Sequence, residues 1–417
     1  MPTYRALLAR KGVVRLFGAA ALSRITTSMF GLSVLLAVLH ARGSYAAAGS
    51  VLTCHALALA LCAPVSGRLA DRFGPRPALS VAIAVHAMGY VALLAALRAN
   101  APFPHLALAA MVTGASTPPA SPITRAQWPS RIPADSLRAI YAMDAALNSA
   151  AFVAGPLVVA ALTLAVSPHA TLALAACAKI AGDCLLATSP TLARVAPTAS
   201  ARIEPRAPAG LEPDPRAAPR AHDGRRHGLR RLVGPVAEPQ VFLLLGITAL
   251  DTFGFGAMHV GGAIVAHGEG AAGLLSSALA VGEVAGGLAF GARTWAGTAR
   301  AQLTALHLAT GALLAGMSAV RGFAGLGVLY FACGLLAGAR DSLDQMALGD
   351  AAPAGYRTET FAWLATFMWT GYGAGTFVSG QLQARAGTTA VYLAAALAGL
   401  LAALLATRLR ALSPRPA

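Results

Sequence analysis

The chain has 417 residues, of which 57% are hydrophobic and only 12% are charged, and its formal net charge is +16. A soluble domain carries roughly 25% charged residues, so this composition leaves too little polar surface for a water-facing globule. The basic residues lie in short clusters between apolar stretches, which also argues against a nucleic-acid-binding protein.

Six apolar segments of membrane-spanning length lie in the first half of the chain. A helix needs roughly 20 apolar residues to cross the hydrocarbon layer. Pro118, Pro119 and Pro122 interrupt the fourth segment, but membrane helices tolerate proline where neighbouring groups bond the freed carbonyls. The sequence predicts helices over 16–39, 46–66, 78–97, 104–124, 139–163 and 168–188.

A polar stretch rich in proline and arginine follows, at 191–236. It has no apolar periodicity and cannot bury a core, so it is interpreted as a mostly disordered cytoplasmic linker between a first half (1–190) and a second half (237–417). The second half repeats the pattern of the first. Helices are predicted over 240–265, 271–292, 302–320, 323–345, 359–383 and 388–407.

The basic residues indicate the orientation of these twelve helices. If the N-terminus is cytoplasmic, all but six of the 32 basic residues fall in cytoplasmic loops or at the termini. This asymmetry predicts that both termini are cytoplasmic. The excess of arginine and alanine is typical of a high-GC bacterium, so the expected location is the bacterial cytoplasmic membrane. The six exceptions are Arg24, Arg42, Arg98, Lys179, Arg321 and Arg385.

The most specific motif follows the second segment. Gly67 would allow close approach of a neighbouring helix, and Gly74 would permit a tight turn. Asp71 could accept hydrogen bonds from nearby arginines or from a helix N-terminus. The motif reads Gly67-Arg68-Leu69-Ala70-Asp71-Arg72-Phe73-Gly74-Pro75-Arg76. It closely resembles the loop signature of the major facilitator superfamily, Gly-x-Leu-Ala-Asp-Arg-x-Gly followed by basic residues, although Pro75 stands where a basic residue is usual.

The resemblance implies an all-α membrane protein with two pseudo-symmetric six-helix bundles. It further implies a monomer that moves a small molecule by alternating access, without a cofactor. In this family the loop, here Gly67, Asp71, Arg72, Gly74 and Arg76, helps to lock the outward-facing state. A degenerate second copy runs from Gly286 to Arg293 and lacks the aspartate.

Two further motifs bear on the kind of transport. Gly155-Pro156 resembles the core of a motif associated with antiporters, although Val159 and Ala160 replace its terminal glycines. The alternative is that the Gly-Pro pair simply bends the helix. The arginine motif that many drug exporters carry midway along the fourth helix is not recognisable, because Arg125 is assigned to the cytoplasmic end.

Ionisable side chains inside a spanning helix cost about 2.5–3.5 kcal/mol at its centre, so each one is a functional candidate. Arg24 and Asp144 lie at intermediate depth on the first and fifth segments, and we expect them to form an intramembrane pair. Asp144 is also a candidate for proton coupling; the alternative is a purely structural ion pair. Lys179 and Asp183 are four residues apart and are expected to neutralise each other locally.

The second half contains two acids without a basic partner in their own segments, Asp251 and Glu283. A carboxyl group removed from water can exchange protons near neutral pH, so both are candidates for proton coupling. They could instead accept hydrogen bonds from nearby serines or face water. Arg340, Asp341 and Asp344 are expected to form a salt-bridge network at an inner gate, with a solvated helix end as the alternative.

Other chemistry-bearing residues give weaker signals. Five histidines (His40, His55, His86, His259 and His307) and five cysteines are scattered without metal-ligand spacing, so no metal site is expected. No catalytic motif such as HExxH or GxSxG is present, which argues against an enzyme. An aromatic stripe on the eleventh segment would serve core packing or would stack on flat organic substrates. It comprises Trp363, Phe367, Trp369 and Tyr372.

These observations favour a secondary active transporter that exports a small organic solute in exchange for protons. Two alternatives of the same fold remain at this point. One is a nutrient importer, working as a symporter or facilitator, and the other is a non-transporting sensor or assembly protein.

Overall fold

The computed structural model describes residues 7, 9, 11–43, 45–193, 234–265, 269–293, 295–320 and 322–410. Within this part of the chain every regular element is a helix and no strand is present. All twelve predicted apolar segments form helices, the fourth as two helices separated by a short break, which confirms the all-α prediction. Most of the predicted linker, 194–233, lies outside the described residues.

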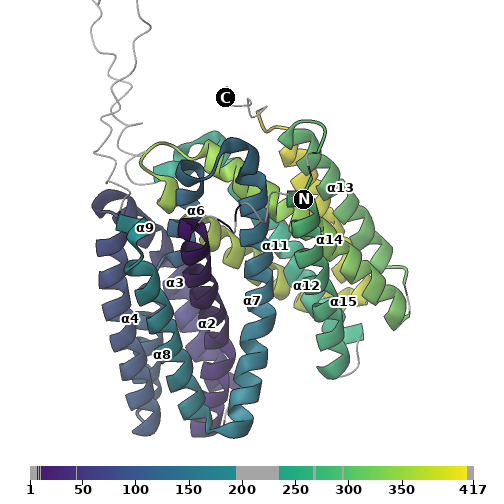
Figure 1. The fold of residues 1–417 in the computed structure, drawn as a ribbon. Coiled ribbons are helices and arrows are strands. Elements are labelled where there is room, and N and C mark those ends of the chain that lie inside the picture. The colour runs from purple at the N-terminus through teal and green to yellow at the C-terminus, as the bar shows by residue number, and fades with distance from the viewer. Residues whose placement is uncertain are drawn as a thin grey trace, which may run out of the picture.

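The first group of helices forms one side of the molecule (Figure 1). Its elements are α2 (Lys11–Arg42), α3 (Tyr45–Phe73), α4 (Pro75–Arg98), α5 (Phe103–Ala115), α6 (Ala120–Arg131), η1 (Ala134–Ser136), α7 (Leu137–Ala165), α8 (Pro168–Ala187) and α9 (Pro190–Ala193).

The second group of helices forms the other side. The last two predicted segments of this half form one helix that is interrupted only at Gly387. The positive φ of 76° at Gly387 marks the turn between the two segments. The elements are η2 (Gly234–Ala237), α11 (Pro239–Val265), α12 (Glu269–Gly291), α13 (Ala299–Met317), α14 (Phe323–Ala351) and α15 (Arg357–Ala406).

The fourth predicted segment is broken into two helices. Pro118 and Pro119 lie in the non-helical residues between α5 and α6, and α6 continues to Arg131, beyond the predicted end at residue 124. Proline lacks an amide hydrogen and its ring collides with the preceding turn, so two consecutive prolines end a helix. The break carries Arg125 into a buried position instead of a loop.

The outer helix faces are apolar and exposed. Leu164 of α7 is 92% exposed and Leu61 of α3 is 76% exposed. Nine helical stretches among the described residues are long and apolar enough to cross a membrane. The remaining predicted segments correspond to α5–α6, α13 and the first part of α15, which are helical too. Such exposed apolar faces would be unfavourable in water but suit lipid.

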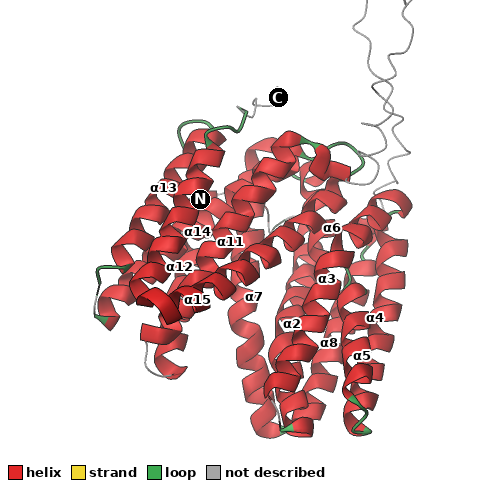
Figure 2. Ribbon diagram, turned by 180° about the vertical axis from the view of Figure 1, so that it is seen from behind, coloured by secondary structure: helices red, strands yellow, loops and turns green. Residues whose placement is uncertain are grey.

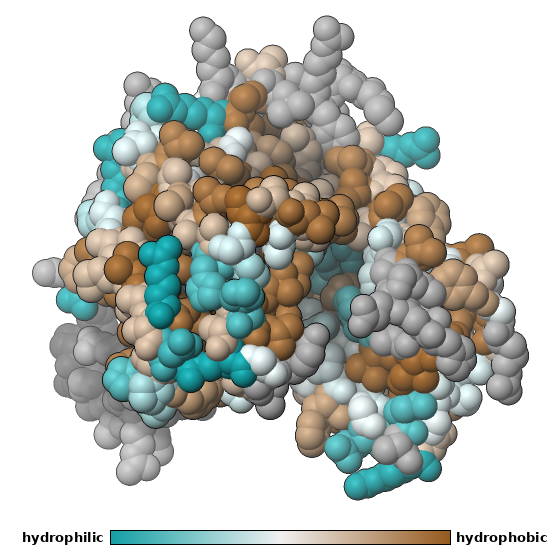
Figure 3. Space-filling view, turned by 90° about the horizontal axis from the view of Figure 1, so that it is seen from below, coloured by the Kyte–Doolittle hydropathy of each residue, from teal (hydrophilic) through white to brown (hydrophobic). Residues whose placement is uncertain are grey.

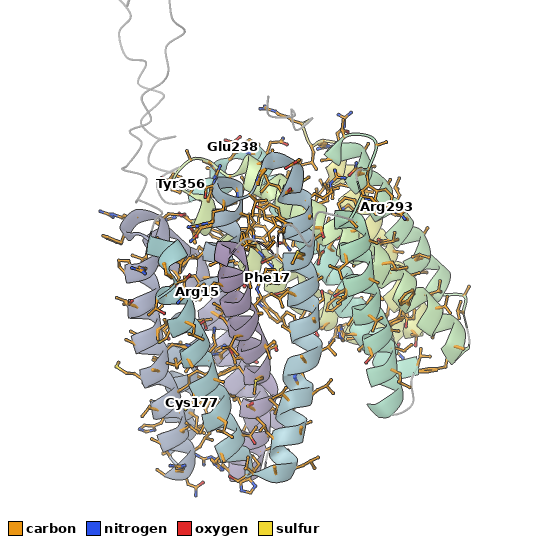
Figure 4. All side chains as sticks on the ribbon, in the orientation of Figure 1. Arg15, Phe17, Cys177, Glu238, Arg293 and Tyr356 are labelled. Carbon is orange, nitrogen blue, oxygen red and sulfur yellow. The ribbon has the colours of Figure 1, made fainter. Side chains whose placement is uncertain are left out.

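The two groups of helices meet where α3 and α6 pack on α15, and where α7 packs on α12 and α14. They converge at the end where α6 lies and diverge toward the opposite end (Figures 1 and 2). We call these the closed end and the open end. Glu238 and Tyr356 lie at the closed end, whereas Cys177 lies toward the open end (Figure 4).

Glycines allow α12 and α14 to touch backbone to backbone. Gly282 and Gly286 of α12 pack against Gly334 and Gly338 of α14, and a Cβ added at any of them would fall under 3.0 Å from the partner helix. Small residues four apart are the usual device for close helix packing in lipid. The glycine of the degenerate second motif, Gly286, therefore serves this contact.

We expect Gly338→Ala to destabilise the protein, because its Cβ would collide with the α12 backbone and overpacking costs roughly 1–3 kcal/mol. Thermal unfolding of the detergent-purified protein would measure the loss. Gly246→Ala in α11 is the matched control, since nothing lies within 4 Å of its added Cβ. Equal melting temperatures for the two variants would contradict the packing role.

Candidate functional site

At the closed end, Asp71 of α3 caps the N-terminus of α15 in the other half. One carboxylate oxygen accepts a hydrogen bond from the Thr358 amide (3.1 Å), and the other accepts one from the Glu359 amide (2.8 Å). The first amides of a helix have no partner within it and carry its partial positive charge. A single carboxylate of the motif thus joins the two halves.

An ion pair reinforces this contact. The Arg68 guanidinium group donates to both carboxylate oxygens of Glu359, at 2.6 and 3.0 Å. Gly67 lies so close to α15 that an added Cβ would be 2.7 Å from the Glu359 Cα atom. Glu359 was not identified from the sequence, although it is the acid in the first turn of a predicted helix.

The rest of the motif shapes the turn into α4. Gly74 has a φ of 88°, which favours glycine, and Pro75 begins α4 where a proline is well tolerated. Arg76 donates to the carbonyl oxygens of Ala187 and Ser189 at the end of α8, at 3.1 and 3.3 Å. The Arg72 guanidinium group lies over the Phe73 ring. Arg72 and Arg76 therefore contact their own half.

A buried charge cluster lies within the first half. Arg24 of α2 donates to one carboxylate oxygen of Asp144 on α7 (2.6 Å), and Arg125 of α6 donates to the other (2.7 Å). Arg24 also donates to the Asp144 carbonyl and to the Ser121 hydroxyl. Arg125 was predicted to lie in a loop at the cytoplasmic end; the structure instead buries it within α6, which lies at the closed end.

Lys179 and Asp183 form a second buried cluster in the first half. The Lys179 ammonium group lies 2.9 Å from one Asp183 oxygen, and the Ser23 hydroxyl donates to the other (2.6 Å). These contacts join α8 to α2. Gly155 of α7 likewise packs against Ser28 of α2, where an added Cβ would meet both backbone and side chain.

The second half contains a cluster centred on Asp251 of α11. Its two carboxylate oxygens lie 3.0 Å from the Arg340 Nε atom and 3.1 Å from the His307 Nδ1 atom. Arg340 of α14 also donates to the Thr310 hydroxyl of α13 (3.0 Å). Asp251 therefore has basic partners on other helices. Arg340, which was expected to form a salt-bridge network at an inner gate, lies in this cluster and makes both of these contacts within the second half.

The carboxyl and imidazole atoms of Asp251, His307 and Asp344 lie within 4.8 Å of one another, which is close enough to hold a metal ion. No other such group is found among the residues the structure describes. However, the Arg340 guanidinium group already pairs with Asp251 there. A fixed positive charge opposes cation binding, so the residues fit an ion-pair cluster better than a resident metal.

A cavity of about 350 Å³ lies between the halves. Its lining includes Asn148, Ser149 and Phe152 from α7 of the first half, and residues of α11, α12, α14 and α15 from the second. Viewed from the open end, a recess separates the two sides of the molecule (Figure 3). Three of the predicted acids line the cavity: Asp251, Glu283 and Asp341. Asp144 is not among its lining residues.

The comparisons with known proteins agree with this architecture. A family model described as Major Facilitator Superfamily matches residues 16–296. No curated protein matches the chain.

Among solved structures, the chain is similar to the human organic anion transporter MFSD10 (16% identity, 95% of this chain and 99% of that chain, TM-score 0.73). It is also similar to a bacterial homologue of the iron transporter ferroportin in an outward-facing state (16% identity, 95% of this chain and 98% of that chain, TM-score 0.68). A third similar structure is that of the transporter FucP in the outward conformation (13% identity, 95% of this chain and 99% of that chain, TM-score 0.66). At these identities the likeness concerns the fold alone.

Proposed function

The chain belongs to the Major Facilitator Superfamily and is a membrane transporter, and from this premise we propose that it exports a small organic solute in exchange for protons. Transport would proceed by alternating access, with the two halves rocking about the cavity between them. The proposed units are the halves at 1–190 and 237–417, joined by the linker at 191–236, and the working unit is a monomer.

The observation that supports this function best is a cavity lined by both halves and blocked at one end only. Asp71 and Arg68 fasten α3 to α15 at the closed end, while the cavity lining comes from both halves. The closed end carries the arginine-rich loop, which supports a cytoplasmic position for it and for both termini in a bacterial cytoplasmic membrane. The conformation is then outward-facing.

Proton coupling is assigned to Asp251. As a carboxylate it pairs with Arg340 and His307. Protonation would remove its charge and free Arg340 to move toward Asp341 and Asp344, which also interact with that guanidinium group. A proton could thereby redistribute charge at the cavity wall. Glu283 faces the same cavity and Asp144 lies in the first half; both remain alternative carriers.

The export direction rests on the Gly155-Pro156 pair of α7. Pro156 lies inside α7, and Gly155 brings this helix against α2. The pair resembles a motif associated with antiporters. An antiporter of this kind would move the solute out of the cell as protons enter.

Accumulation of fluorescent dyes and antibiotics in efflux-deficient bacteria tests the proposal. Cells expressing the protein should accumulate less compound, and a protonophore should restore accumulation. Higher accumulation in expressing cells would instead indicate an importer. No proton-dependent change with any compound, despite confirmed membrane insertion, would overturn proton-driven export.

We expect Asp71→Asn to loosen the closed end. The asparagine keeps one acceptor oxygen, but its NH2 group cannot accept from the second backbone amide, and the charge that favours a helix N-terminus is lost. Loss of the charge alone costs about 1 kcal/mol, or about a fivefold shift between conformations. Ala362 is buried beside Gly67, so a cysteine introduced there reports opening. In a background without native cysteines, its maleimide labelling should speed up about fivefold. Asp135→Asn, at an exposed acid, should leave the rate unchanged.

A further inference from the structure

The charges around the cavity do not cancel. Asp251 is paired with Arg340. Glu283 and Asp341 also line the cavity, and neither forms an ion pair within the described part of the chain. Apart from Arg340, the cavity lining contains no lysine or arginine. The cavity therefore presents two carboxyl groups without an ion-pair partner, which a cationic ligand could engage.

Aromatic rings form a continuous wall beside these acids. Phe152 of α7 and Trp369 of α15 have ring centroids 6.4 Å apart, which brings the two halves together across the cavity. Trp369 is followed by Tyr372 (6.0 Å) and then by Phe255 of α11 (6.0 Å). The negative face of an aromatic ring attracts a cation, most strongly where water is excluded.

Glu283 is the acid best placed to act on both halves at once. It projects from α12 of the second half, and its carboxyl group lies beside the Ser149 hydroxyl of α7 in the first half. A charged ligand that engages Glu283 would therefore sit at the boundary that must open and close during transport. Asp341, from α14, adds a second carboxyl group to the same cavity lining.

We propose that this cavity binds a lipophilic organic cation, with Glu283 as its counter-charge and the rings of Phe152, Trp369 and Tyr372 stacking on its apolar part. The inference rests on the proposed transport function and names its substrate class. The cavity volume of about 350 Å³ suits a small organic molecule. An organic anion would instead face Glu283 and Asp341, and Arg340, the one arginine of the lining, is already paired with Asp251.

Two ions of nearly equal size and shape but opposite charge test this without a mutation. Tetraphenylphosphonium and tetraphenylborate would be titrated into the wild-type protein, purified in an uncharged detergent, by isothermal calorimetry. The cation should bind at least about tenfold more tightly than the anion. Equal binding of the two ions, preference for the anion, or no binding of the cation would overturn the proposal.

Two variants locate the binding determinant. Glu283→Gln keeps the shape of the side chain and should weaken cation binding about tenfold, while Glu238→Gln at the closed end should leave it unchanged (Figure 4). Trp369→Ala should weaken binding of the cation as well, because it removes the central ring of the wall. Equal cation affinities for the two glutamine variants would overturn the role of Glu283.

This binding assay does not depend on transport. If the cation binds as expected but no compound is exported in a proton-dependent way, the proposed function fails while the binding site stands. If proton-driven export of other compounds is found but the cation does not bind preferentially, the substrate class fails alone.

Discussion

Replacing Asp251 with asparagine should abolish solute accumulation driven by a proton gradient while leaving solute exchange intact. Asparagine has nearly the same shape as aspartate but cannot take up or release a proton. Arg340 would lose its 3.0 Å ion pair with Asp251, yet Asp341 and Asp344 also interact with it, so the variant should fold. Binding of the solute would persist because the cavity keeps its shape.

Proteoliposomes separate these two activities. An imposed pH gradient should drive uptake by the wild-type protein and by Asp135→Asn, but not by Asp251→Asn. Exchange of labelled for unlabelled solute, without a gradient, should proceed in all three. If Asp251→Asn still accumulates solute at the wild-type rate, the carrier is another residue, and Glu283→Gln is the next variant to measure.

The fold could be predicted from the sequence because the bilayer sets the length of every apolar segment. Each of the twelve segments is helical, and the turn between the last two falls at Gly387, between the predicted ends. The fourth segment was predicted less well. Its prolines were identified, but only the structure shows that α6 resumes the helix and extends to Arg131.

The clusters of charge could not be predicted in the same way. Asp251 pairs with Arg340 and His307, which lie on two other helices. They are too far from Asp251 in the sequence for any helical periodicity to predict the contact. No partner was predicted for His307, since a lone histidine in an apolar segment gives no sign of the residue it contacts. The contact of Asp71 with the N-terminus of α15 was one of two possibilities, and only the packing of α3 on α15 distinguishes them.

Removing the charge of Asp144 from the Arg24–Asp144–Arg125 cluster should have the largest effect on the stability of the folded protein. Asp144 is fully buried and supplies the carboxylate for both guanidinium groups. Asp144→Asn would leave two buried positive charges facing each other without a counter-charge. Breaking a buried pair in this way costs about 3–5 kcal/mol, because the remaining charge is not compensated by water. We expect little folded protein from this variant.

Removal of an arginine from the same cluster should have a much smaller effect. The three side chains carry one excess positive charge, so Arg125→Gln leaves Arg24 and Asp144 as a neutral pair held by its 2.6 Å contact. Heating followed by size-exclusion chromatography would compare Asp144→Asn, Arg125→Gln and the exposed control Asp135→Asn. Equal losses for the first two variants would show that packing, and not charge balance, decides the stability of the cluster. If Arg125→Gln folds and still transports, the cluster is structural; if it folds and does not transport, Arg125 acts in the transport cycle.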